Sequence, residues 1–177
     1  MVMDMGRETV QEAVELTYRH EVRDFAAALR ARRKVSRSGR VMMWSIGLGF
    51  VAFALIAAAQ LAAGRVDPFS LLLMCYFGVG LPVVPLLQAR GLARVADLIG
   101  PCRTTVTDEG VTIRAEHTTL FQGWGARPVY RETPEVFVLF SGDRNARCLT
   151  PLPKRGLADP ADADRLRAIL DRHLTRA

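Results

Sequence analysis

The chain has 177 residues, half of them hydrophobic, and a formal net charge of +6. A single segment, residues 30–40, carries six cations and no carboxylate, so it matches the whole basic excess. A charge this concentrated does not indicate a nucleic-acid-binding protein, which needs basic and aromatic residues on one folded face, and no nucleic-acid partner is predicted.

Residues 1–40 are predicted to form a cytoplasmic amino-terminal segment. Apolar residues alternate over residues 13–19, which indicates a short strand. Four apolar residues then have the spacing of a short amphipathic helix: Val22, Phe25, Ala26 and Leu29. Two arrangements are open, since the strand can join the carboxy-terminal sheet or the helix can lie on the membrane with its apolar face down.

A basic cluster ends this segment, directly before a long apolar run. Its members are Arg30, Arg32, Arg33, Lys34, Arg37 and Arg40. Arg90 and Arg94 follow a second apolar run, whereas Arg65 alone lies between the runs, which is the positive-inside pattern. Both termini are therefore predicted to be cytoplasmic. We expect the basic cluster to contact lipid headgroups, because each cation near an anionic leaflet adds about 1 kcal/mol of attraction.

The two apolar runs, residues 41–63 and 69–87, predict a transmembrane hairpin. At 1.5 Å per residue both reach about 30 Å, the thickness of the hydrocarbon core. Residues 64–68 form the predicted extracytoplasmic turn, in which Asp67 and Pro68 are typical of a helix start. A soluble protein with two buried helices fits less well, because too few residues follow to surround them.

Neither run contains an ionisable side chain of the kind that a pore or proton relay normally needs. The first run carries a helix-packing stripe of small residues, Ala54, Ala58 and Ala62, with Gly78 and Gly80 as matching small residues in the second. Pro82 and Pro85 should kink the second helix, which is predicted to run on into the cytoplasm so that it covers residues 69–99.

Residues 100–177 are predicted to form a small antiparallel β domain capped by a helix. Gly100 and Pro101 end the preceding helix. The strand candidates are residues 103–107, 111–116, 117–122, 128–132, 136–140 and 146–150. The last helix has one apolar face and a predicted cap at Asp159 and Pro160; the face consists of Leu166, Ile169, Leu170 and Leu174. The fold class is thus an α+β membrane protein.

Three short motifs carry a resemblance to a known family. They are residues 106–113, Gly123-Trp124 leading to residues 129–132, and the turn at residues 152–155. With the order of elements over essentially the whole chain, they resemble the YcxB-like family of bacterial membrane proteins. The resemblance implies a pleckstrin-homology-like sheet capped by a helix, in a bacterial inner-membrane protein. It implies no activity, because the function of that family is not established.

Residues that could carry chemistry are sparse, and neither a metal nor a cofactor is predicted. Three histidines stand far apart without ligand spacing, His20, His117 and His173, and the cysteines Cys75, Cys102 and Cys148 form an odd set without C-x-x-C spacing. A nucleophilic pair of Cys148 and His117 is conceivable on adjacent strands but lacks an orienting partner. Lys154 and Arg155 are candidate contacts for a phosphate or headgroup ligand.

These patterns predict a membrane-anchored binding or scaffolding module rather than an enzyme. Its ligand would be a protein, a peptide or a lipid headgroup beside the bilayer. The alternative is a small oligomeric transport or channel subunit assembled on the helix-packing stripe, with a protein partner or a homo-oligomer possible in either case. A membrane enzyme is the third class, and it would need a convergent nucleophile or metal set.

Overall fold

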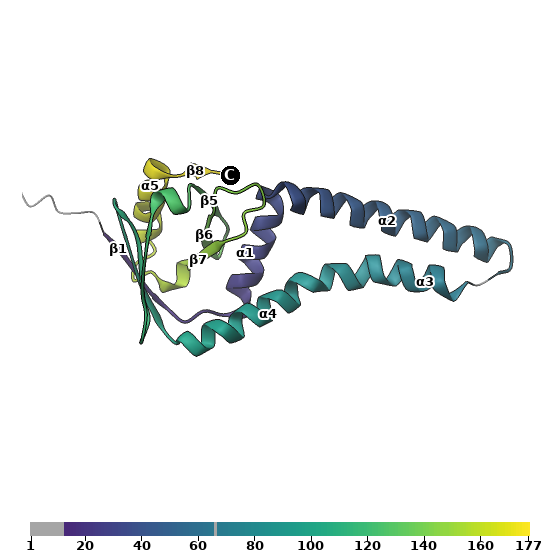
Figure 1. The fold of residues 1–177 in the computed structure, drawn as a ribbon, viewed down its shortest axis with the longest axis horizontal. Helices are drawn as coiled ribbons and strands as arrows, with labels where there is room; N and C mark the ends of the chain where they lie inside the picture. The colour runs from purple at the N-terminus through teal and green to yellow at the C-terminus, as the bar shows by residue number, and fades with distance from the viewer. Residues whose placement is uncertain (1–12, 66) are drawn as a thin grey trace, which may run out of the picture.

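The computed structural model describes residues 13–65 and 67–177, which form a two-sheet body with a long helical hairpin extending from it (Figure 1). Both strands and helices contribute to the body, so the fold is α+β. The hairpin consists of α2 (Arg37–Ala62), α3 (Pro68–Cys75), a π-helical turn (Tyr76–Gly80) and α4 (Leu81–Ile99).

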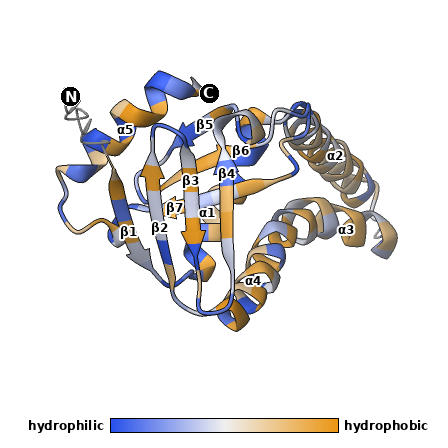
Figure 2. Ribbon diagram, turned by 60° about the vertical axis from the view of Figure 1, so that its left-hand side comes forward, coloured by the Kyte–Doolittle hydropathy of each residue, from blue (hydrophilic) through white to orange (hydrophobic). Residues whose placement is uncertain are grey.

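The first sheet is antiparallel and has the order β1-β2-β3-β4 (Figure 2). Its strands are β1 (Val14–Tyr18), β2 (Cys102–Thr107), β3 (Gly110–Arg114) and β4 (Thr119–Gly123). Val14 pairs with Val106 and Tyr18 with Cys102, so the amino-terminal strand joins the carboxy-terminal sheet, as one of the two arrangements predicted. The alternating apolar residues of β1 explain this, because they place Val14, Leu16 and Tyr18 in the core.

The second sheet has the order β7-β6-β5-β8, and its strands are β5 (Val129–Glu132), β6 (Val136–Phe140), β7 (Leu149–Pro153) and β8 (Thr175–Arg176). β5 and β8 are parallel, so the prediction of a wholly antiparallel domain is wrong for this pair. β6 is buried on both faces: Phe137 and Leu139 face the core between the sheets, whereas Val136, Val138 and Phe140 pack against α1.

The strand predicted over residues 146–150 begins three residues later. The Asp143 carboxylate accepts hydrogen bonds from the backbone N–H groups of Asn145 and Arg147, which holds this segment in a turn. Ala146 there has a positive φ of 45°. The strand then includes Pro151 and Pro153, which are tolerated because β7 is an edge strand.

The carboxy-terminal helix α5 (Asp162–His173) packs as predicted, with Leu166, Ile169 and Leu170 fully buried in the core between the sheets. Its start differs from the prediction. The Asp159 carboxylate accepts a hydrogen bond from the Ala161 N–H at 2.8 Å, and the Asp159 carbonyl accepts one from Asp162. These bonds form a separate turn, so the helix begins at Asp162 rather than at Pro160.

Helix α1 (Val22–Val35) packs with its apolar face on the protein. Ala27, Ala28 and Ala31 lie against the second sheet, and Phe25 and Leu29 lie against three alanines of α4: Ala89, Ala93 and Ala96. The alternative prediction, in which this face lies on the membrane, is therefore wrong. α1 packs on the protein because its buried alanines are small, which lets the helix approach both the sheet and α4 closely.

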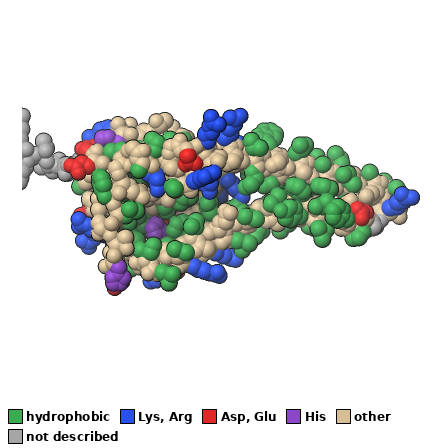
Figure 3. Space-filling view, in the orientation of Figure 1, with side chains coloured by type: hydrophobic (Ala, Val, Ile, Leu, Met, Phe, Trp, Pro, Cys, Tyr) green, Lys and Arg blue, Asp and Glu red, His purple; other side chains and the backbone are tan. Residues whose placement is uncertain are grey.

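The hairpin helices are long and apolar enough to cross a membrane. In the most apolar 18-residue window of each helix, the buried share of the window is 0% for α2 and 6% for the continuous helix from Pro68 to Ile99. A core helix of a soluble protein would instead be mostly buried. Figure 3 shows an apolar surface along the hairpin with charged side chains at its base and its tip. The predicted cap is confirmed, since Asp67 accepts hydrogen bonds from the N–H groups of Phe69 and Ser70.

The second hairpin helix changes its winding just before its two prolines. Pro82 and Pro85 lack an amide hydrogen, and a proline ring clashes with the carbonyl four residues earlier. The turn Tyr76–Gly80 is accordingly π-helical, with the Leu81 N–H donating to the Tyr76 carbonyl. The helix continues to Ile99 and ends at Gly100, whose φ is 83°, as predicted.

The contact within the hairpin places glycines against aromatic rings. Gly49 lies against the Phe77 ring, Gly78 against the Phe50 ring, and Phe53 stacks on Phe77 with 5.6 Å between ring centroids. Gly80 faces Tyr76 of its own helix. Of the predicted stripe, Ala54 is half-buried, whereas Ala58 and Ala62 are exposed.

Candidate functional site

A cavity of about 330 Å³ lies between the two sheets, and we call it the intersheet cavity. β1 to β4 and β7 contribute to its lining, and α1 and α4 add residues on the side of the hairpin. Its volume is at the lower end of the range typical of small-molecule sites. The cavity is thus built by the same elements that connect the body to the hairpin.

The lining is mainly apolar because α4 is amphipathic beyond the hairpin. Its alanines face α1, which leaves Leu92, Val95 and Ile99 turned to the cavity, 40%, 59% and 48% exposed. Ile113 and Leu120 line it from the first sheet. Exposed apolar side chains gathered around a hollow are typical of a ligand-binding surface.

Two buried polar atoms in this lining have no hydrogen-bond partner within the described residues: Nε of Arg127 and Nδ1 of His20. Arg127 uses one Nη1 N–H for the Ala126 carbonyl at 3.1 Å. Among the described residues of the lining there is no aspartate or glutamate. A buried guanidinium N–H without an acceptor costs free energy, so the cavity is complementary to an anionic group.

His20 lies between Tyr18 and Phe25, with ring centroids 4.9 and 5.1 Å away. Burial lowers the pKa of His20 below its ordinary value, so the imidazole is neutral at pH 7 and one of its nitrogens can donate. The Tyr18 hydroxyl is already bonded to Thr104 at 2.9 Å, and burial raises the pKa of Tyr18 to about 12. His20 and Arg127 therefore each have a buried nitrogen that is free to bond a ligand.

The cavity supplies binding groups but no activated nucleophile among the residues described for it. Cys102 lines it, and burial raises the pKa of this thiol, so it stays protonated. Thr150 donates to Gln122 at 3.0 Å, which links β7 of one sheet to β4 of the other. The arrangement thus suits reversible binding of an amphipathic molecule better than covalent chemistry.

Lys154 and Arg155, predicted as ligand contacts, are engaged within the protein. Lys154 pairs with Glu132 at 2.6 Å and lies 4.8 Å above the Phe137 ring. Arg155 pairs with Asp24, which is completely buried, and donates to the Arg19 carbonyl at 2.8 Å. Both cations therefore have a structural role, which their distance in sequence from Asp24 and Glu132 concealed.

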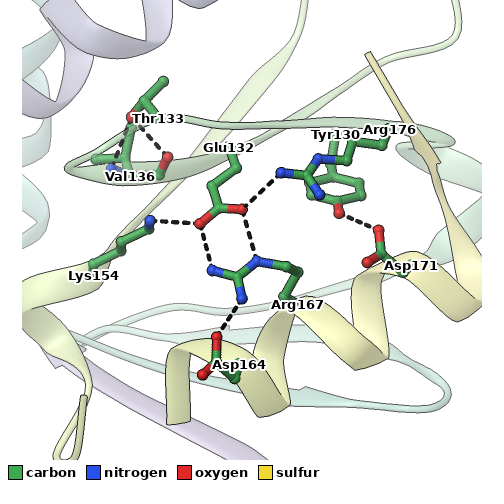
Figure 4. A network of polar contacts seen from close by, with 9 residues as sticks. All are labelled: Tyr130, Glu132, Thr133, Val136, Lys154, Asp164, Arg167, Asp171 and Arg176. Carbon is green, nitrogen blue, oxygen red and sulfur yellow. Dashed lines mark hydrogen bonds and ion pairs between the residues drawn. The ribbon is translucent and has the colours of Figure 1, made fainter. Parts of the chain in front are cut away.

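Glu132 is the centre of an ion-pair network that sequence reasoning missed (Figure 4). Arg167 of α5 donates to both carboxylate oxygens at 2.7 and 2.8 Å, and Arg176 of β8 donates at 3.2 Å. Hydrogen bonds and charges from Arg167 and Lys154 lower the pKa of Glu132 to about 2. The network joins β5 to α5, β8 and the turn after β7.

The predicted basic cluster spans the end of α1 and the start of α2, at the base of the hairpin. None of its six side chains forms an ion pair with a carboxylate of the described residues. Arg32 donates to the Asn145 carbonyl at 3.1 Å, and Arg33 contacts the Met43 sulfur at 3.9 Å. The other four are exposed: Arg30, Lys34, Arg37 and Arg40.

The remaining residues considered for chemistry do not come together in one site. His117 is exposed in the turn between β3 and β4, whereas Cys148 precedes β7 in the other sheet, so the predicted placement on adjacent strands is wrong. Trp124 has a structural role, since its Nε1–H donates to the Asp108 carbonyl at 2.7 Å and its ring stacks on His173. Across residues 13–65 and 67–177, no group of three or more histidines, cysteines or carboxylates could hold a metal ion.

Comparison with protein-family models, with curated proteins and with solved structures gives no match, so the YcxB-like resemblance stays a prediction from the motifs and the functional argument depends on the residues themselves.

Proposed function

We propose that this protein is a membrane-anchored binding module whose intersheet cavity takes an amphipathic ligand with one acidic group. The observation that carries the proposal is a mainly apolar cavity in which, among the residues that the structure describes, an arginine nitrogen has no hydrogen-bond partner and no carboxylate lines the wall. The two-sheet body is the binding part and the hairpin is the anchor.

The anchor follows from the hairpin surface and the basic cluster. Two apolar helices with almost no buried residues need an apolar solvent, and a bilayer provides it. Unpaired cations at the base of the hairpin favour a cytoplasmic body with both termini inside, and we propose that the exposed members of the cluster contact anionic headgroups. α1 fixes the body to α4 through the contact of Phe25 and Leu29 with the alanines.

The ligand class follows from the division of the lining. Leu92, Val95 and Ile99 offer apolar contact to a hydrocarbon or aromatic portion, whereas Arg127 offers a charge-assisted hydrogen bond to a carboxylate. A neutral His20 can add a second hydrogen bond. A ligand without the acid would leave the arginine unpaired, so the acid should decide affinity.

Binding of 4-phenylbutyrate tests the proposal, with 4-phenylbutanol as the uncharged analogue. The full chain in phosphatidylcholine nanodiscs is titrated by saturation-transfer NMR, with empty nanodiscs as blank. We expect the acid to bind more tightly than the alcohol, and Arg127→Gln to reduce its affinity about tenfold, the loss typical of one charge-assisted hydrogen bond.

The matched control is Arg103→Gln, which removes the same charge from an exposed position of β2 outside the cavity lining. This variant should bind the acid like the wild type. Equal affinity for acid and alcohol, or equal losses in the two arginine variants, would contradict the proposal.

A further inference from the structure

α2 and α4 separate towards the body, and α1 passes between them (Figure 1). A second cavity, of about 270 Å³, lies in this fork. Six of its lining residues carry the argument: Arg32, Arg33, Met42, Val84, Pro85 and Gln88. The corner between α1 and α2 is tight, because a Cβ at Gly39 would lie 2.7 Å from the Arg33 backbone. This fork cavity shares no lining residue with the intersheet cavity.

Arg33 borders the fork cavity and also a neighbouring hollow that is lined by Met43, Glu132 and Glu135. Nη2 of Arg33 is buried and has no hydrogen-bond partner in the described part of the chain, and burial lowers the pKa of Arg33. The other Nη of this side chain contacts the Met43 sulfur, at 3.9 Å. Arg32 is a second cation, and the described residues that line the fork include neither a carboxylate nor an aromatic ring.

The cavity also spans two environments. Met42 and Val84 belong to the ends of the apolar runs, whereas Gln88 and the two arginines belong to the polar flank. Trp44, two residues after Met42, is 82% exposed on α2, and tryptophan is enriched where headgroups meet acyl chains. If the hairpin spans the bilayer, the fork lies at the depth of phospholipid phosphates.

We propose that the fork binds one anionic phospholipid, with its phosphate on Arg33 and the upper part of an acyl chain along Met42 and Val84. This site is distinct from diffuse headgroup contact by the exposed cluster, and it rests on the proposed membrane insertion. Two cations without a carboxylate favour a headgroup of net negative charge. They disfavour phosphatidylcholine, whose ammonium finds neither a carboxylate nor an aromatic ring in the lining.

Native mass spectrometry of the full chain tests this site. Delipidated protein in micelles is mixed with phosphatidylglycerol and phosphatidylcholine of the same acyl chains, in equal amounts. We expect one phosphatidylglycerol to be retained in preference to phosphatidylcholine. Arg33→Gln should lower its affinity about tenfold, as expected for a lost charge-assisted hydrogen bond, whereas Arg90→Gln, the same change in charge at an exposed position of α4 outside the lining, should not.

Two further measurements distinguish a specific lipid site from diffuse surface charge and from binding of free anions. Val84→Trp keeps every charge and fills the cavity, so it should also abolish retention, and it carries the test if Arg33→Gln does not fold. Equal losses in the two arginine variants, or no loss in Val84→Trp, would overturn the site in favour of diffuse surface charge. Displacement of the lipid by millimolar inorganic phosphate would assign the fork to free anions and overturn the lipid. Binding of 4-phenylbutyrate by Arg33→Gln reports separately on the intersheet cavity.

Discussion

Asp24 is a completely buried carboxylate whose charge is neutralised from a distant part of the chain. Arg155, 131 positions away, donates to it at 2.6 Å through Nη2, and the backbone N–H of Glu21 donates at 2.8 Å. Arg155 also pairs with Glu21 at 3.2 Å. The pair therefore connects the start of α1 to the turn after β7.

Replacing Arg155 by methionine should destabilise the protein by about 3–5 kcal/mol, because it leaves the buried Asp24 charge without its partner. Chemical denaturation in micelles measures this loss. Arg165→Met is the control, since Arg165 is 55% exposed and its pair with Asp162 should be worth less than about 1 kcal/mol. Similar losses in both variants would show that Asp24 is stabilised by other groups.

Glu132 predicts a pH dependence of stability. Its folded-state pKa is about 2 against an ordinary value of 4.5. The stabilisation is therefore complete above pH 4.5 and is lost as the pH falls from 4.5 towards 2, by about 3 kcal/mol. Glu132→Gln should remove this part of the pH profile, measured by denaturation between pH 2 and 6. Glu135→Gln, in the exposed turn before β6, should keep the wild-type profile.

At the scale of elements, the α1–α4 contact depends on small side chains. Ala93 is 4% exposed and faces Phe25 and Leu29. Ala93→Leu should destabilise the contact by about 1–3 kcal/mol through overpacking. Gly91→Ala, two residues away with no atom within 4 Å of the added Cβ, should instead stabilise the helix by up to about 1 kcal/mol. Thermal unfolding of both variants checks the difference in sign.

The elements themselves were predictable where local chemistry decides them. The strand at residues 136–140, the amino-terminal strand and the helix end at Gly100 agree with the sequence patterns. Predictions were wrong where a side chain intervened: Asp143 delays β7, and Asp159 forms a turn before α5. The two-residue strand β8 gives no periodic signal, because tertiary contact with β5 alone defines it.

At the scale of the whole molecule, both candidate sites were beyond sequence reasoning. The intersheet cavity combines Tyr18, Leu92 and Arg127, and the fork cavity combines Arg33 with Val84. These residues converge only because β1 pairs with β2 and α1 packs on α4. The sequence did identify Arg33 as part of a basic cluster, but not that its Nη2 is buried without a hydrogen-bond partner among the described residues.

The orientation of the whole chain can be tested with its own cysteines. Cys148 is exposed on the body, Cys102 is buried, and Cys75 lies exposed on the hairpin, so Cys75→Ala leaves one accessible thiol. Arg65→Cys adds a second thiol at the exposed tip of the hairpin. With both termini cytoplasmic, a membrane-impermeant maleimide should label position 65 in intact cells, and Cys148 only after permeabilisation.

The reverse pattern, with Cys148 labelled from outside and position 65 protected, would invert the topology. Labelling of both positions in intact cells would contradict the membrane-spanning hairpin. Because the basic cluster determines orientation in this argument, neutralising its exposed members should weaken the bias: Arg30, Lys34, Arg37 and Arg40. Arg33 is unchanged in that variant, so the labelling reports on orientation without altering the proposed lipid site.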